Sequence, residues 1–178
     1  VILINKSLKT YGGDLAIGAY GIVNRIVFLF IMIVMGFNQG MQPIAGYNFG
    51  ARQFDRLIQV LKYTIFCGVT VTTVGFLAGQ IFPRPLIYLF TSDETLTNIA
   101  VEGLRIVLIF FPVVGFQMVT SSFFQSIGMA KKAIFLSLTR QLLFLIPSLL
   151  VFPSIWGTVG VWMSMPVADA IATIVAAC

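Results

Sequence analysis

Three charged side chains that lie deep inside apolar stretches are the residues best placed to do chemistry: Arg25, Arg140 and Asp169. They fall about ten, nine and eleven residues into their stretches, which puts them at similar depths in a bilayer if each stretch is a helix. Such charges usually face water or the interior of a helix bundle. The arrangement fits either a proton or cation site or a buried ion pair. We favour an ion pair between Arg140 and Asp169, because arginine does not release its proton at physiological pH.

A second group of polar residues follows helical spacing. Gln117, Thr120 and Ser121 are related as i, i+3 and i+4 and share one helix face. They would bind substrate or water if they face a cavity, and would link helices if they face a neighbour. Asn24 and Arg25 are further cavity candidates.

Catalysis has little support in the sequence. The chain has no histidine, no Gly-x-Ser-x-Gly and one mid-span acid, so neither a hydrolase nor a two-aspartate protease can be assembled from it. Cys67 and Cys178 have no metal-ligand or redox spacing. The net charge of +5 comes from scattered basic residues rather than a basic stripe, which argues against nucleic-acid binding. We therefore predict no enzyme, no metal and no cofactor.

The composition is that of a membrane protein. Of 178 residues, 58% are hydrophobic and 10% are charged, whereas soluble domains have about 25% charged residues. We predict an all-α, polytopic helical bundle, with the end of a sixth helix in residues 1–10. Because the chain begins at Val1 and stops in an apolar run, we expect it to be a piece of a longer polypeptide. The five complete spans are predicted at 15–40, 55–82, 94–127, 131–151 and 158–178.

Local signals set the predicted ends of these spans. Tyr11 to Asp14 forms a turn with two glycines, and Pro83-Arg-Pro85 ends the second span. Thr91 and Glu94 have the spacing of a capping box at the start of the third span, and Pro112 predicts a kink within it.

Orientation follows from the basic residues, which favour the cytoplasmic side. The 42–62 and 128–132 segments are therefore predicted to be cytoplasmic. Five basic residues fall on that side and three on the other: Arg52, Arg56, Lys62, Lys131 and Lys132 against Lys6, Lys9 and Arg84.

The stretch from Gly36 to Arg52 combines four glycines, a proline and several amides. Pro43 lacks an N–H and disfavours a helical conformation at Gln42, so we expect the first complete helix to end or bend there and a loop to follow. By itself this is equally well read as a simple exit turn of a membrane helix.

The pattern Gln42-Pro-Ile-x-Gly-Tyr-Asn-x-Gly-Ala51 resembles the loop after the second helix of each half in multidrug and toxic compound extrusion (MATE) transporters. The motif residues in this sequence are Gln42, Pro43, Gly46, Asn48 and Gly50. Further segments resemble the second half of that family in similar order and spacing: Tyr11-Gly-Gly-Asp-Leu-Ala-Ile-Gly-Ala-Tyr-Gly-Ile, Leu89-Phe-Thr-Ser-Asp-Glu, Gln125-Ser-Ile-Gly128, Thr139-Arg-Gln141 and Gly160-Val-Trp-Met-Ser-Met-Pro-Val-Ala-Asp169.

The resemblance implies that residues 1–178 are the C-terminal lobe of a twelve-helix, multi-pass antiporter of the cell's inner or plasma membrane. Such a protein exports cationic, amphipathic molecules against a proton or sodium gradient. Its partners would be that substrate, the ion, the lipid bilayer and the missing N-terminal lobe, and this lobe alone would be inactive.

Two features limit what the resemblance implies. Sodium-coupled branches carry an acid in the tenth helix, but there is no Asp or Glu between Ile106 and Met129, which points to an ion site in the missing half. Related folds flip lipid-linked saccharides, and this alternative would need a basic groove, for which a single Arg25 is weak support.

Overall fold

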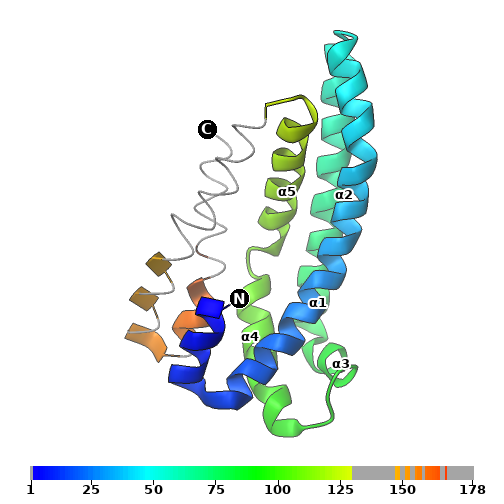
Figure 1. The fold of residues 1–178 in the computed structure, drawn as a ribbon. Coiled ribbons are helices and arrows are strands. Elements are labelled where there is room, and N and C mark those ends of the chain that lie inside the picture. Colours follow the sequence, from blue (N-terminus) through cyan, green and yellow to red (C-terminus); the bar gives the residue numbers. More distant parts are fainter. Residues whose placement is uncertain are drawn as a thin grey trace.

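The computed structural model describes residues 2–129, 147–148, 151–152, 155–157, 159–164 and 167, and all regular structure in these residues is helical. Figure 1 shows that α1 and α2 form a long antiparallel hairpin, against which α4 and α5 pack as the chain runs back along it. The helices are α1 (Ile2–Gly50), α2 (Phe54–Ile81), α3 (Pro83–Tyr88), α4 (Glu94–Leu108) and α5 (Phe111–Ser126). The expectation of an all-α helical bundle is confirmed.

Two helices in this part of the chain are long and apolar enough to cross a membrane. They are the 38-residue segment Gly13–Gly50 of α1 and the 28-residue α2. Helices α4 and α5 are bent by 52° at a short break and are long and apolar enough to be a third if the pair is taken as one broken span. The predicted spans 55–82 and 94–127 agree with these helices, whereas the predicted spans 131–151 and 158–178 lie largely outside the described residues.

The loop predicted after residue 40 is wrong, because α1 continues through Pro43 to Gly50. Pro43 removes one backbone hydrogen bond, but its ring lies on the exposed side of the helix. Met41 and Ala45 are buried on the opposite side, and this packing outweighs the local cost of the proline. The helix ends instead in a Schellman motif, in which the N–H of Gln53 donates to the carbonyl of Asn48 at 2.9 Å.

The predicted turn at residues 11–14 is present as a sharp kink. Gly13 has φ 70° and ψ −167°, a conformation essentially restricted to glycine, and it separates the N-terminal turns of α1 from the long span.

The third span breaks next to its proline, as predicted. Pro112 lies in the first turn of α5, and Ile109 donates its N–H to Ile106 instead of to Arg105. The carbonyl of Arg105 accepts a hydrogen bond from the side-chain Nε2 of Gln80 at 2.9 Å. Gln80 on α2 thus satisfies a carbonyl that the break leaves free.

The capping box predicted from Thr91 and Glu94 is replaced by a different cap. Asp93 is the N-cap of α4, and its carboxylate accepts from the N–H groups of Thr95 at 2.8 Å and Leu96 at 3.1 Å. Thr91 accepts instead from the N–H of Asp93. A carboxylate at the positive end of a helix makes this cap favourable.

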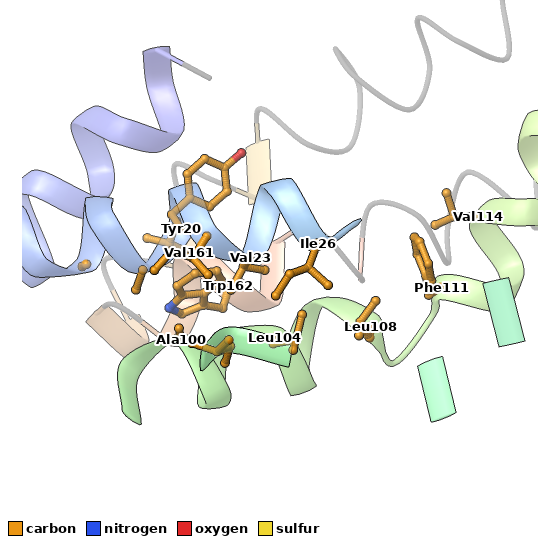
Figure 2. Close-up of a cluster of buried hydrophobic side chains, with 14 residues drawn as sticks. Tyr20, Val23, Ile26, Ala100, Leu104, Leu108, Phe111, Val114, Val161 and Trp162 are labelled. Atoms are coloured by element: carbon orange, nitrogen blue, oxygen red, sulfur yellow. The ribbon is translucent and has the colours of Figure 1, made fainter. Parts of the chain in front are cut away.

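The main apolar cluster joins α1, α4, the start of α5 and the 161–162 segment. Figure 2 shows Trp162 between α1 and α4, close to Val23 and Ala100. The rings of Trp162 and Tyr20 are 6.0 Å apart. A Cβ added at Gly103 would come within 2.6 Å of the Trp162 ring, so only glycine lets α4 approach this indole.

Helix α2 packs through a face of small residues. Gly68, Thr72, Gly75 and Gly79 are all buried and follow an i, i+4, i+7, i+11 spacing. Added Cβ atoms at the glycines would meet α1 and α5 near Gly68 and Gly75, and α4 near Gly79. This seam brings the helix backbones into close contact.

Candidate functional site

Buried polar side chains are few in the part of the chain that the structure describes. Four of them hydrogen-bond to carbonyls of their own helix one turn earlier. These are Asn48 to Ile44 at 2.8 Å, Thr72 to Gly68 at 3.0 Å, Thr97 to Asp93 at 2.7 Å and Ser164 to Gly160 at 2.8 Å. The other two, Asn38 and Gln117, each keep a buried side-chain oxygen without a hydrogen-bond partner.

Gln117 lies on α5, in the second turn after the break. Its neighbours Gly115 and Val119 face Gly68 of α2. Because Gln117 is two residues from each, it is about 200° around the helix from them and faces away from α2. Its side chain is 4% exposed, and its Oε1 accepts no hydrogen bond.

The other polar residues predicted on this helix are half-buried. The hydroxyl of Thr120 donates to the carbonyl of Phe116 at 2.9 Å, so its proton is already used within α5. Ser121 lies one turn after Gln117 on the same face. Gln117 is therefore the buried group on this face whose side-chain oxygen has no hydrogen bond, and that oxygen can accept one from an ammonium, an N–H or a water.

Asn38 was not singled out in the sequence as a site residue. It lies on the α1 face that carries Val34, Met41 and Ala45, which are buried with Leu57 of α2 and two α5 residues. The helical spacing of Asn38 from Val34 and Met41 is the signal that could have placed it on the buried face.

Asn24 and Arg25 take a different position from Gln117. Both are exposed on α1, between the buried Val23 and Ile26. The structure therefore does not bring them into the buried surroundings of Gln117. Arg140 and Asp169 lie outside the described residues, as do Thr139 and Gln141, which flank Arg140 in the sequence.

The residues of the family motif sit at the end of α1 rather than in a loop. Gly46 closely approaches α5, since an added Cβ would lie 3.3 Å from the carbonyl of Ser126. Asn48 is buried, Gln42 is half-buried, and Pro43 and Gly50 are exposed. The motif thus shapes the contact between the ends of α1 and α5.

The described residues contain no group of three or more His, Cys, Asp or Glu side chains that could hold a metal ion. The arrangement offers hydrogen bonding and apolar contact.

Comparison with protein-family models gives a match to the MatE family over residues 2–150. Among curated proteins, the chain is 25% identical over 175 residues to the multidrug export protein MepA of Staphylococcus aureus (strain bovine RF122 / ET3-1). It is also 25% identical over 175 residues to MepA of Staphylococcus haemolyticus (strain JCSC1435). Each alignment covers 98% of this chain and 38% of the relative. The chain thus spans less than two-fifths of the length of these relatives.

Solved structures of MATE transporters share the fold of this chain. The chain is 36% identical to the MATE multidrug transporter DinF-BH, with a TM-score of 0.84. It is 24% identical to a MATE transporter of the MOP superfamily in an outward-facing conformation, with a TM-score of 0.89. These matches cover 98% of this chain and 39% and 40% of the respective solved chains.

Proposed function

The chain belongs to the MatE family, and from this premise we propose that residues 1–178 form the C-terminal lobe of an antiporter that exports cationic or amphipathic small molecules. The driving force is a proton or sodium gradient across the inner or plasma membrane. Relatives that carry the name multidrug export protein support the substrate class. The apolar α1 and α2, which are long enough to cross a bilayer, support the membrane setting.

The free acceptor of Gln117 is the observation that carries this proposal. A buried amide oxygen without a partner costs about 1–3 kcal/mol, and a ligand or water that donates a hydrogen bond recovers part of that cost. The neighbouring Phe116 is half-buried and adds apolar contact for a ligand, whereas Met118 packs against the buried clusters.

Replacing Gln117 tests the proposal in the full-length protein, expressed in bacteria that lack other efflux pumps. We expect Gln117→Leu to lower ethidium export about fivefold, which corresponds to about 1 kcal/mol. Gln125→Leu is the matched control, because Gln125 is exposed on the same helix. Export by Gln117→Leu at the wild-type rate and membrane level would refute a role for this side chain.

Export also needs the second lobe, because alternating access requires two lobes around a shared site. Cells that express residues 1–178 alone should therefore accumulate as much ethidium as cells with an empty vector. Lower accumulation in the former would show that one lobe suffices.

The roles of the two mid-span charges, Arg140 and Asp169, are proposed from the sequence. We take Arg140 and Asp169 as an ion pair, so that Arg140→Asp combined with Asp169→Arg restores the expression that each single variant loses. If Asp169→Asn inserts normally but abolishes proton-driven export, Asp169 is instead the coupling residue.

The orientation follows the basic residues. The α1–α2 turn lies at the same end of the bundle as the end of α5 (Figure 1). We place that end, with Arg52 and Arg56, in the cytoplasm.

A further inference from the structure

The outer surface of α2 carries two shallow grooves that meet at Lys62. The first has a volume of about 640 Å³ and is lined by Asp55, Ile58, Gln59, Lys62 and Tyr63. The second has a volume of about 500 Å³ and continues along the helix from the same lysine, lined by Lys62, Ile65, Phe66, Val69, Thr70, Thr73 and Val74. This side of α2 is opposite the glycine seam, which packs against the other helices.

The two grooves differ in chemistry in the way that the two parts of a phospholipid differ. The first combines an acid, an amide, a lysine and a tyrosine with one isoleucine. The second is apolar beyond Lys62 except for two threonine hydroxyls, and each of these donates to a carbonyl of α2 at 2.7 Å. The second groove therefore offers no free hydrogen-bond donor from these threonines and suits a hydrocarbon chain.

The dimensions also match one leaflet of a bilayer. From Lys62 to Val74 the helix rises about 18 Å, and half of a hydrocarbon core is about 15 Å thick. From Lys62 outward to Asp55 it rises about 10 Å, comparable to the headgroup layer of about 5–8 Å. With Val74 at the bilayer midplane, Lys62 and Tyr63 would lie near the boundary between the acyl chains and the headgroups, where such side chains are common.

The charges in the first groove are ordered along the axis of α2. Asp55 lies in the first turn of the helix, Lys62 lies two turns closer to its middle, and the exposed Gln59 is between them on the same helix face. Both charged residues are exposed, and the structure records no ion pair between these two described residues. In phosphatidylethanolamine the phosphate is likewise the deeper group and the ammonium the outer one.

We propose that this face of α2 binds a phosphatidylethanolamine molecule. Its phosphate lies at Lys62, its ammonium donates hydrogen bonds to Asp55 and Gln59, and one acyl chain follows the groove past Phe66 to Val74. Asp55 selects against phosphatidylcholine, whose quaternary ammonium has no N–H to donate, and against phosphatidylglycerol, whose headgroup carries no positive charge.

Lipid binding to the purified full-length protein tests this site. In native mass spectrometry with equal amounts of three lipids of identical acyl chains, we expect phosphatidylethanolamine adducts to exceed phosphatidylcholine and phosphatidylglycerol adducts about fivefold. Asp55→Asn should reduce the preference for phosphatidylethanolamine over phosphatidylcholine, because the hydrogen bond to a neutral amide is weaker than the one to a carboxylate, and Lys62→Gln should weaken binding of all three lipids. Glu94→Gln and Arg84→Gln are matched controls. Arg84 in α3 and Glu94 at the start of α4 are exposed charges that follow α2 in the chain and line neither groove.

A series of headgroups with one, two and three N-methyl groups gives a second measurement that does not depend on any variant. Adduct levels should fall stepwise as N–H donors are lost in the wild-type protein, and the fall should be smaller in Asp55→Asn. Equal binding of phosphatidylethanolamine and phosphatidylcholine to the wild-type protein would overturn the proposal, as would the same preference in wild type and Asp55→Asn. The absence of any bound phospholipid would overturn it as well, since the groove would then be covered by other parts of the protein.

Discussion

The close crossing of α2 and α5 predicts that Gly115 does not tolerate even a methyl group. A Cβ at this position would meet the Oγ1 of Thr72 and would lie 2.9 Å from both the Cγ2 of Thr72 and the carbonyl oxygen of Gly68. Because one of these atoms belongs to the backbone of α2, the two helices would have to separate. Overpacking of this kind costs about 1–3 kcal/mol.

A matched glycine isolates this steric cost. Gly→Ala also stabilises a helix through its backbone propensity, by about 1 kcal/mol. At Gly36 an added Cβ meets nothing within 4 Å, so Gly36→Ala carries the propensity gain alone. The difference in unfolding free energy between Gly115→Ala and Gly36→Ala should therefore be about 1–3 kcal/mol, with Gly115→Ala the less stable.

The measurement is equilibrium unfolding of the full chain in mixed detergent micelles, followed by circular dichroism as the SDS fraction rises. Adding Thr72→Ala to Gly115→Ala removes the two side-chain atoms but leaves the Gly68 carbonyl in place, so it should restore part of the loss. Equal unfolding midpoints for Gly115→Ala and Gly36→Ala would refute the reasoning, because the helices would then not be in contact at this crossing.

Three further substitutions have outcomes that the same unfolding assay can check. Gly13→Ala should destabilise the chain by about 1–3 kcal/mol, because φ 70° with ψ −167° is accessible only to glycine; no loss of stability would mean that the kink relaxes freely. Asp93→Ala should cost about 1 kcal/mol by removing the N-cap of α4, whereas Asp93→Asn should cost only a few tenths; a neutral Asp93→Ala would rule out the cap. Gln80→Leu should cost about 1 kcal/mol, because the carbonyl of Arg105 loses the hydrogen bond from Gln80; unchanged stability would show that another group replaces it.

The bounds and breaks of the helices could be predicted well where the residues of a helix themselves determine them. The apolar length of residues 55–82 sets the extent of α2, and the observed helix is Phe54–Ile81. Pro112 predicted the break in the third span because a proline acts on its own helix through the missing N–H and its ring. These effects need no knowledge of the neighbouring helices.

The prediction that α1 ends near residue 40 is wrong because non-local contacts decide the end of this helix. Pro43 carries the same local penalty as Pro112, but Met41 and Ala45 are buried against other helices and Gly46 closely approaches Ser126. Contacts between distant segments decide in favour of the helix, and they are not visible in the local sequence.

The candidate site was predictable only in part for the same reason. Helical spacing grouped Gln117 with Thr120 and Ser121, and the structure shows Gln117 buried with a free acceptor. Spacing alone does not say which face of a helix has a neighbour, so it could not distinguish the buried Gln117 from the exposed Asn24 and Arg25.

The break between α4 and α5 has a consequence for biosynthesis. With 15 and 16 residues, the two halves are about 23 and 24 Å long, and neither can cross a hydrocarbon core of about 30 Å alone. During translation the insertion machinery must release both halves into the lipid together. The completed α2, which brings the Gln80 amide to the freed Arg105 carbonyl, has already been synthesised when they arrive. The order of synthesis thus supplies the hydrogen-bond donor before the broken span needs it.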